Sequence, residues 1–201
     1  DNQLGKFALA FSNTVLVSGN NSVLCCGTNN LTIGVSGSTS NRLVISDGAL
    51  VCNIASLSVA TNNSIDFRGG ELTVRNITYR NNPPFIGDGV QPFTITALSN
   101  GILNFINGFT LNTNSTISGI TRITNGGLAT IHGTLQPGGI GQVGGMTNVG
   151  AITFTPTSAL VFDIAATNSF DILQFSNATA QLNGSIRPNL LSGYTPASTS
   201  L

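Results

Sequence analysis

The chain has 201 residues, which is enough for one sizeable domain or two small ones. Only 7% of the residues are charged, against roughly 25% in typical soluble domains, and seven acidic residues balance seven basic ones. This balance argues against a nucleic-acid-binding protein and against binding to anionic membrane surfaces, because both need an excess of basic residues. No apolar run approaches the roughly 20 residues of a membrane-spanning helix.

Short apolar bursts, most of them three to five residues long, follow one another along the chain. Asn, Gly, Ser, Thr and Asp separate them, and these residues favour turns because they accept positive φ or bond the nearby backbone. The bursts are rich in β-branched and aromatic residues, which predicts β-strands almost throughout. In chain order the predicted strands are TVLV (14–17), SVLCC (22–26), LTIG (31–34), RLVIS (42–46), ALVC (49–52), LSV (57–59), SIDF (64–67), ELTV (71–74), ITY (77–79), FTIT (93–96), ILNF (102–105), FTL (109–111), TRIT (121–124) and LATIHG (128–133).

Strands this short bury enough apolar area only if each stacks on its equivalent one coil later, as in a parallel β-solenoid. The segments NNLTIGVSGSTSNRLVISDGALV (29–51) and ASLSVATNNSIDFRGGELTV (55–74) look like successive copies of a unit of roughly 20–25 residues. We therefore predict an all-β fold whose coils have three strands and a triangular cross-section. Asparagine side chains at the turns are expected to pair from coil to coil in ladders.

Two breaks divide the predicted solenoid. The segment 80–93 holds three of the seven prolines and is expected to loop out of the stack, because proline cannot donate to a strand ladder. Residues 135–150 are the most glycine-rich stretch, and we interpret them as a turn. We thus expect solenoid coils over 1–134 and a β-rich region over 151–201 that closes the same domain.

The sequence has one local concentration of charge, near the predicted loop at 80–93. The structural interpretation is a solvated ion-pair patch on one outer face, and the alternatives are a saccharide-binding patch or a catalytic carboxylate pair. The patch consists of Asp66, Arg68, Glu71, Arg75 and Arg80.

Neither a metal site nor a nucleophilic triad is indicated elsewhere. The single histidine, His132, is expected on a strand surface, and one histidine without CxxC spacing cannot complete a common zinc set. We therefore expect no catalytic residue, no metal ligand and no cofactor.

The sequence leaves open which of the three cysteines are free and which form disulfides. Adjacent strand residues point to opposite faces, so at most one of Cys25 and Cys26 is expected to share a face with Cys52. The cysteines are expected to be small buried residues, or to form one disulfide, for which Cys26–Cys52 is the candidate, or to bridge subunits.

The ends of a solenoid expose unpaired strand edges, which need a cap or a partner. The apolar start of the chain, LGKFALAF, is the candidate cap or, alternatively, an assembly segment that pairs with another subunit, with Leu4, Phe7, Leu9 and Phe11 as its large apolar side chains. Together with zero net charge, it suggests head-to-tail association of subunits into a fibre.

Two stretches resemble a known family. NNLTIGVSGSTSNRLVISDGALV resembles the repeat LxVGxxGSxNxLxISNGGxV of bacterial autotransporter-type passenger proteins. The segment from GGLATIHGTLQPGG to LLSGYTPAS resembles the block GTLxPGxSPGxLTVxGxLTLxxGSxLxFDI…xxDxLxVxGxAxLxGxLxxxLLxGYxP that often ends such arrays. The matching positions are Leu135, Pro137, Gly138, Gly139, Phe162, Asp163, Ile164, Asp171, Leu173, Leu182, Gly184, Leu191, Gly193, Tyr194 and Pro196.

The resemblance covers most of residues 22–196. It implies a right-handed parallel β-helix on the cell exterior with a structural or adhesive role, and it offers no shared active site to carry across. Self-association and surface glycans are therefore the expected partners, in an extracellular protein that is not an enzyme. The alternative is a carbohydrate-binding or pectin-lyase-like β-helix, because some pectin-degrading enzymes share this fold.

Overall fold

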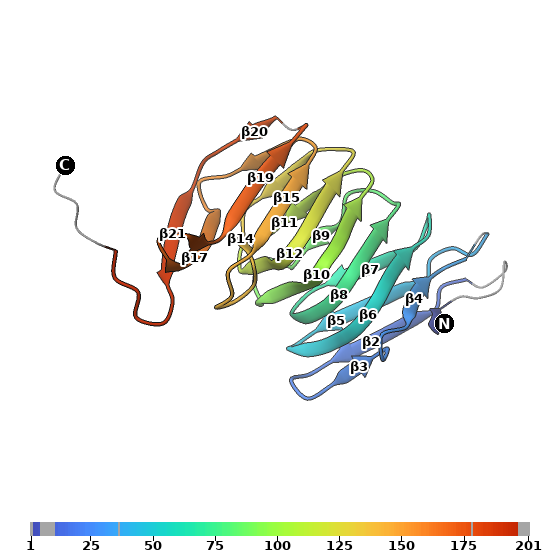
Figure 1. Cartoon of the computed structure of the whole chain (residues 1–201). Helices are drawn as coiled ribbons and strands as arrows, with labels where there is room; N and C mark the ends of the chain where they lie inside the picture. Colours follow the sequence, from blue (N-terminus) through green and yellow to red (C-terminus); the bar gives the residue numbers. More distant parts are fainter. Residues whose placement is uncertain (1, 5–10, 36, 178, 197–201) are drawn as a thin grey trace.

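The computed structural model describes residues 2–4, 11–35, 37–177 and 179–196. In these residues all regular secondary structure is β, and the strands wind into a parallel solenoid of about seven turns. The coils stack in chain order, with β2 and β3 near one end and β20 and β21 at the other (Figure 1). The predicted all-β solenoid fold is confirmed.

One side of the solenoid, here called face 1, is a sheet of eight parallel strands, one from each coil. Its strands are β2 (Thr14–Ser18), β5 (Arg42–Ser46), β7 (Ser64–Phe67), β9 (Phe85–Ile86), β11 (Phe109–Leu111), β13 (Ala129–Ile131), β16 (Ile152–Phe154) and β20 (Ala180–Gln181).

The second sheet has thirteen strands, and its long members bend to cover two further sides, face 2 and face 3. The bend shows as a register shift, for example between Ala97 and Gly101, so each coil has three straight runs as predicted. The long strands are β6 (Ala49–Val59), β8 (Gly70–Tyr79), β10 (Phe93–Phe105) and β12 (Ser115–Asn125). On face 2 the shorter strands are β3 (Val23–Cys25), β14 (Thr134–Pro137), β17 (Ala159–Ala166) and β21 (Ser185–Leu190), and on face 3 they are β1 (Asn2–Leu4), β4 (Asn30–Ile33), β15 (Gly145–Val149) and β19 (Ile172–Ser176).

A short strand, β18 (Ser169–Phe170), departs from the parallel pattern. It pairs antiparallel with the end of β17, so residues 164–170 form a hairpin that leaves the coil before β19 resumes it. The glycine-rich turn is confined to residues 138–144, between β14 and β15.

Glycine is required where the chain turns a corner against the coil before it. Gly119 has φ +120°, and a Cβ there would collide with the carbonyl oxygen of Ala97. Only glycine accepts both this conformation and this close approach of two backbones.

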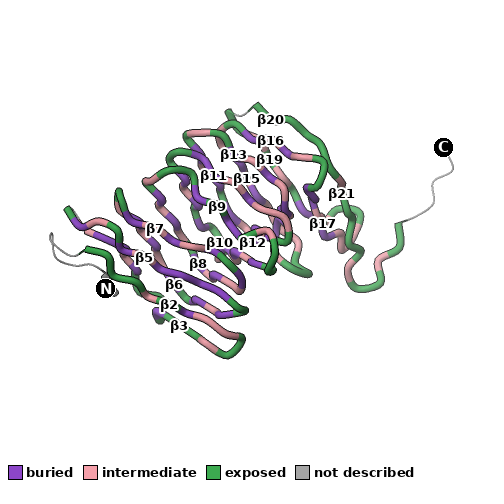
Figure 2. The backbone as a smooth tube through the Cα atoms, turned by 180° about the vertical axis from the view of Figure 1, so that it is seen from behind, coloured by how far each residue is buried: buried purple, intermediate pink, exposed green. Residues whose placement is uncertain are grey.

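The core is built from in-register apolar ladders along the stack. Buried positions recur from coil to coil along the tube in Figure 2. On face 3, Leu57 lies beside Ile77, Ile77 beside Leu103, and Leu103 beside Ile123. These four side chains are almost completely buried, and each such side chain contributes roughly 1.5–3 kcal/mol relative to exposure.

An asparagine ladder lies at the turn that leads into face 1. The Nδ2 group of Asn13 donates to Oδ1 of Asn41 at 2.8 Å, and Nδ2 of Asn41 donates to Oδ1 of Asn63 at 2.9 Å. Asn41 and Asn63 are buried, so these bonds satisfy polar groups that water does not reach. The predicted pairing of asparagines from coil to coil is confirmed over these three coils.

Candidate functional site

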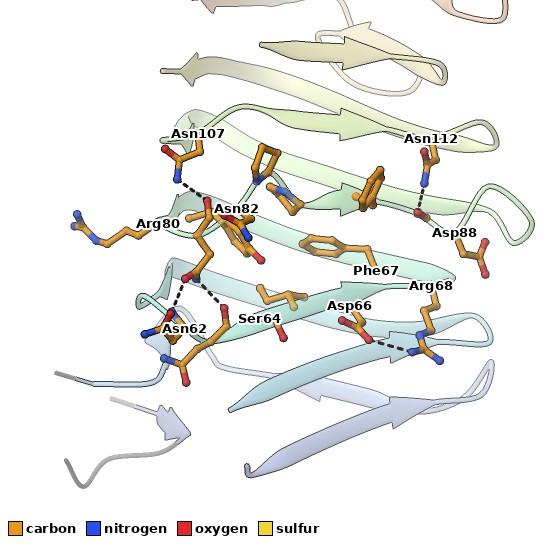
Figure 3. A pocket seen from close by; sticks show the side chains of 18 of the residues that line it. Asn62, Ser64, Asp66, Phe67, Arg68, Arg80, Asn82, Asp88, Asn107 and Asn112 are labelled. Atoms are coloured by element: carbon orange, nitrogen blue, oxygen red, sulfur yellow. Dashed lines mark hydrogen bonds and ion pairs between the residues drawn. The ribbon is translucent and has the colours of Figure 1, made fainter. Parts of the chain in front are cut away.

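The most pronounced irregularity of the solenoid is a groove on face 1. Strand β9 has only two residues, and β7 is paired to it through a single position, Phe67 beside Ile86. Residues 80–83 enter this coil without joining the ladder, and Pro84 contributes only its carbonyl, which accepts the Thr110 N–H at 2.9 Å. This leaves a depression between β7 and β11 (Figure 3). The predicted loop at 80–93 is therefore the wall of a groove, and β9 returns part of it to the stack.

The groove has a volume of about 840 Å³, which lies within the roughly 300–1,000 Å³ of small-molecule sites. Arg80 lies at one end, and Arg68 and Asp88 lie at the other (Figure 3). Phe85 projects outward from β9 and is 66% exposed, while its neighbour Ile86 is fully buried in the core. An exposed phenyl ring thus stands in a groove lined by both polar and apolar side chains.

Side-chain amides hold the groove walls in place. Nδ2 of Asn81 donates to the carbonyl oxygens of Ala60 and Asn63, at 2.8 and 2.7 Å, which fastens the segment 80–84 to the preceding coil. Nδ2 of Asn107 donates to the Asn81 carbonyl at 2.7 Å, from the following coil. The groove is therefore a fixed feature of the fold.

Both carboxylates of the groove already have donors. Oδ2 of Asp66 lies 3.2 Å from Nη1 of Arg42 and 3.1 Å from Nη2 of Arg68. Oδ1 of Asp88 accepts the backbone N–H groups of Val90 and Gln91, both at 2.8 Å. One oxygen of each carboxylate is thus held by donors of the protein itself.

A buried tyrosine, Tyr79, also contributes to the lining of the groove. Burial raises the pKa of its phenol above the ordinary value of 10, so the group remains neutral at physiological pH.

The five charged residues predicted as one patch lie on different sides of the molecule. Asp66, Arg68 and Arg80 line the groove, as predicted for a patch near this loop. Glu71 lies beyond the corner at Gly69–Gly70, where its Oε1 accepts a hydrogen bond from Thr96 Oγ1 at 2.7 Å. Arg75 lies near the bend between faces 2 and 3 and lines a separate hollow of about 330 Å³. The prediction of one common patch is wrong, because the two corners of β8 turn Glu71 and Arg75 away from face 1.

Sequence reasoning identifies neither the groove residue Phe85 nor Arg42, which contacts the groove residue Asp66. Arg42 faces Asp66 because β5 and β7 pair with Arg42 beside Ser64, a spacing close to the repeat length. The sequence places Phe85 only within the predicted loop at 80–93. The 22-residue offset between Arg42 and Ser64 could have identified Arg42 as a neighbour of the next coil. No sequence signal indicates that Phe85 begins a strand of two residues.

The disulfide joins Cys25 to Cys52, and Cys26 is a free, buried thiol. The predicted Cys26–Cys52 pairing is therefore wrong. Strands β3 and β6 pair with Cys25 directly beside Cys52, with their Cα atoms 4.5 Å apart. Cys26 follows on the opposite side and joins the hydrophobic core.

Only part of the predicted assembly segment falls within the described residues. Phe7 and Leu9 lie outside them. Leu4 belongs to β1, which pairs with β4, and Phe11 is exposed and forms an isolated bridge to Thr39.

His132 follows β13, is half-buried, and has its Nδ1 3.2 Å from Thr155 Oγ1.

Comparisons of the chain with protein-family models, with curated proteins and with solved structures find no match. The residues described by the structure contain no helix long and apolar enough to cross a membrane. They also contain no group of three or more His, Cys, Asp or Glu side chains arranged to hold a metal ion.

Proposed function

We propose that this chain is an extracellular adhesive scaffold whose groove on face 1 binds a saccharide chain. The observation that carries this proposal is the exposed Phe85 ring, set in a preformed groove with both polar and apolar lining in an otherwise regular stack.

The groove chemistry suits a sugar. A pyranose has an apolar C–H face that packs on an aromatic ring, and a rim of hydroxyl groups that donate and accept hydrogen bonds. Phe85 supplies the ring, and Asn82, Asn112 and Arg68 supply amide and guanidinium groups around it. A solenoid can hold such a site at a distance from its own end, because the molecule lengthens with each coil while its cross-section stays constant.

Binding fits the groove better than catalysis does. Glycoside cleavage needs one carboxylic acid that donates a proton and a second carboxylate opposite it. Oδ2 of Asp66 is already held by two arginines and Oδ1 of Asp88 by two backbone N–H groups, which ties each carboxylate to the protein. We therefore infer that the chain is not an enzyme.

An extracellular location is supported by the Cys25–Cys52 disulfide, because disulfides persist in oxidising compartments. The low charge and the resemblance of the sequence to autotransporter-type repeats agree with it.

The test is a glycan array, followed by calorimetry with the oligosaccharides that bind. Phe85→Ala should weaken binding at least tenfold, and Asn82→Ala should weaken it less. Phe170→Ala, which removes another exposed phenylalanine far along the chain, is the matched control and should leave the affinity unchanged. Absence of binding to every glycan, or equal losses in Phe85→Ala and Phe170→Ala, would contradict the proposal.

End-to-end association is a second candidate function, favoured by the last coil. Strands β19, β20 and β21 have no further partner among the described residues on one edge, and Ile186 and Leu190 are exposed there. We propose that a second copy pairs with this edge through its first coil, so that copies stack into a fibre.

Light scattering and negative-stain microscopy test this stacking. Ile186→Lys should shorten or abolish fibres, because it places a charge in the stacking interface. Ile102→Lys, on the outer surface of a middle coil, should leave them intact. Monomers at high concentration in the unmodified protein would refute the fibre proposal and leave the saccharide proposal standing.

A further inference from the structure

The hollow beside Arg75 lies at the bend between faces 2 and 3, where two successive strand pairings shift their register. The pairing of β6 with β8 shifts between Val51 and Ile54, and the pairing of β8 with β10 shifts between Ala97 and Ile102. These three strands lie side by side in the stack (Figure 1). The bend leaves a hollow of about 330 Å³ on a different side of the molecule from the groove on face 1.

The backbone around this hollow is held in place from both sides. Thr28 has φ +67° and Asn53 has φ +57°, and the N–H of Thr28 donates to the Asn53 carbonyl at 2.7 Å. A β-branched residue such as threonine rarely adopts positive φ, so the surrounding structure must hold it there. On the other side a Cβ at Gly101 would collide with the carbonyl oxygen of Arg75, so the bulge at 98–101 packs directly against β8.

Asn76 connects the three strands at the point where they bend. Its Nδ2 donates to the carbonyl oxygen of Ala55 on β6 at 3.1 Å, and its Oδ1 accepts the backbone N–H of Ile102 on β10 at 3.0 Å. The hollow is therefore formed by the fold itself before any ligand binds.

Arg75 is the only charged residue among the described residues that line the hollow. Its guanidinium group forms no ion pair and no hydrogen bond within the described part of the chain. The register explains this, because the residues before and after Arg75 pair with Ile54 and Ser56 on β6 and flank the bulge at 98–101 on β10, and none of these positions carries a carboxylate. The hollow thus presents a positive charge without a counterion.

The rest of the lining offers neutral polar groups and a small apolar surface. The side chains of Thr28, Asn53 and Ser56 form no hydrogen bond within the residues that the structure describes, so their hydroxyl and amide groups can bond a ligand. Leu98 is half-buried and adds an apolar side chain. This combination matches a small ligand that carries one carboxylate and several hydroxyl groups.

We propose that the hollow binds an acidic monosaccharide unit, with the carboxylate of the sugar on Arg75. A guanidinium group binds a carboxylate through two parallel N–H···O bonds, which fixes the orientation of the ligand as well as its charge. Thr28, Asn53 and Ser56 supply partners for the ring hydroxyls, and Leu98 contacts the C–H groups of the ring. The volume lies near the lower end of the roughly 300–1,000 Å³ of ligand sites, which suits one sugar unit.

An NMR titration of the full, isotope-labelled chain with sodium glucuronate tests this site, with glucose as the neutral counterpart. Glucuronate should shift the backbone amide signals of residues 28–30, 53–56 and 75–76. Glucose should bind there at least about tenfold more weakly, because it lacks the carboxylate. Phe85→Ala, which alters only the groove on face 1, should leave these shifts unchanged, so failure of the groove proposal and failure of this one are distinguishable.

Arg75→Gln removes the charge and keeps a polar side chain, and it should weaken glucuronate binding at least about tenfold. Arg122→Gln is the matched control, because Arg122 is also exposed, lies outside the hollow and gives the same change in net charge. It should leave the affinity unchanged.

Four outcomes would overturn the proposal. They are the absence of shifts at these residues in the wild type, equal losses in Arg75→Gln and Arg122→Gln, equal binding of glucose and glucuronate, and binding of inorganic sulfate as tight as that of glucuronate. The last result would show a site for small anions in general, to which the sugar hydroxyls add nothing.

Discussion

The middle coils and the last coil follow the same strand pattern but differ in burial. In β10, Leu103 is 0% exposed, whereas Ile186 in β21 is 71% exposed although it also faces the interior of its coil. The register shows the equivalence of the last coil to the others, since Leu135 lies beside Leu160 and Leu160 beside Ile186.

The difference teaches that burial in a solenoid depends on the neighbouring coils. An inward-facing side chain is covered only when a coil lies on each side of it. The two ends are also held by different means, because a disulfide ties the first coil to the second, and the buried Asp163 and Asp171 tie the last coil to the hairpin. Each of the following predictions tests this contrast between middle and ends.

The largest effect is expected from truncating a middle side chain. Phe105→Ala should lower the free energy of unfolding by about 3–5 kcal/mol, because it removes a fully buried ring and leaves a cavity. Ile186→Ala, at the end, should cost less than about 1 kcal/mol. Urea denaturation measures both, and equal losses would show that the last coil is covered in solution.

Removing the disulfide should lower the protection of the first coil from hydrogen exchange, so that this coil is held as weakly as the last one. The bridge closes a loop with a sequence separation of 27, for which chain entropy predicts about 3–4 kcal/mol. Cys25→Ser should therefore increase hydrogen exchange in β2 and β3 and leave β8 and β10 protected. Cys26→Ala is the control, and it should keep the bridge as judged by mass after thiol labelling.

A smaller loss is expected from breaking the asparagine ladder. Asn41→Ala removes partners from the buried amide of Asn63 and from Asn13, and should cost about 1–3 kcal/mol. Asn107→Ala removes one bond at an exposed position and should stay within about 0.5 kcal/mol. Thermal unfolding of the two variants checks this, and similar midpoints would argue that the ladder is not a source of stability.

Much of the fold was readable from the sequence because the repeat is nearly periodic. The spacing of apolar bursts predicted the strands, the three-sided coil and the asparagine ladder. The closing of Cys25 onto Cys52 was not readable, because it depends on where β6 bends between Val51 and Ile54.

The candidate site was readable only in part. The position of Asp66, Arg68 and Arg80 near the loop could be predicted, since they flank it in the chain. The exclusion of Glu71 and Arg75 required the positions of the corners. The groove itself arises because β9 stops after two residues, and periodicity cannot predict the length of one interrupted strand.

The smallest effect concerns pH at the two ends, where the expected signs are opposite. Hydrogen bonds from Ser18 and then Ser46, together with Arg68, lower the pKa of the exposed Asp47 carboxyl. A lowered carboxyl pKa gives stability that is present above the unfolded value of about 4 and is lost as pH falls through the folded value. Because Ser18 lies in the first coil and Asp47 in the second, acid should loosen the first coil.

Hydrogen exchange of β2 should therefore rise below about pH 4, the unfolded value, in the wild type, and Asp47→Asn should remove this rise. Ser18→Ala is a matched variant, because it deletes the hydrogen-bond donor with the largest influence on the Asp47 pKa and keeps the Asp47 carboxyl itself. Acid should leave the last coil closed, because burial raises the pKa of its Asp171 carboxyl and this group gains a proton there. If both ends loosened in the same direction, the two carboxyl environments would not control them.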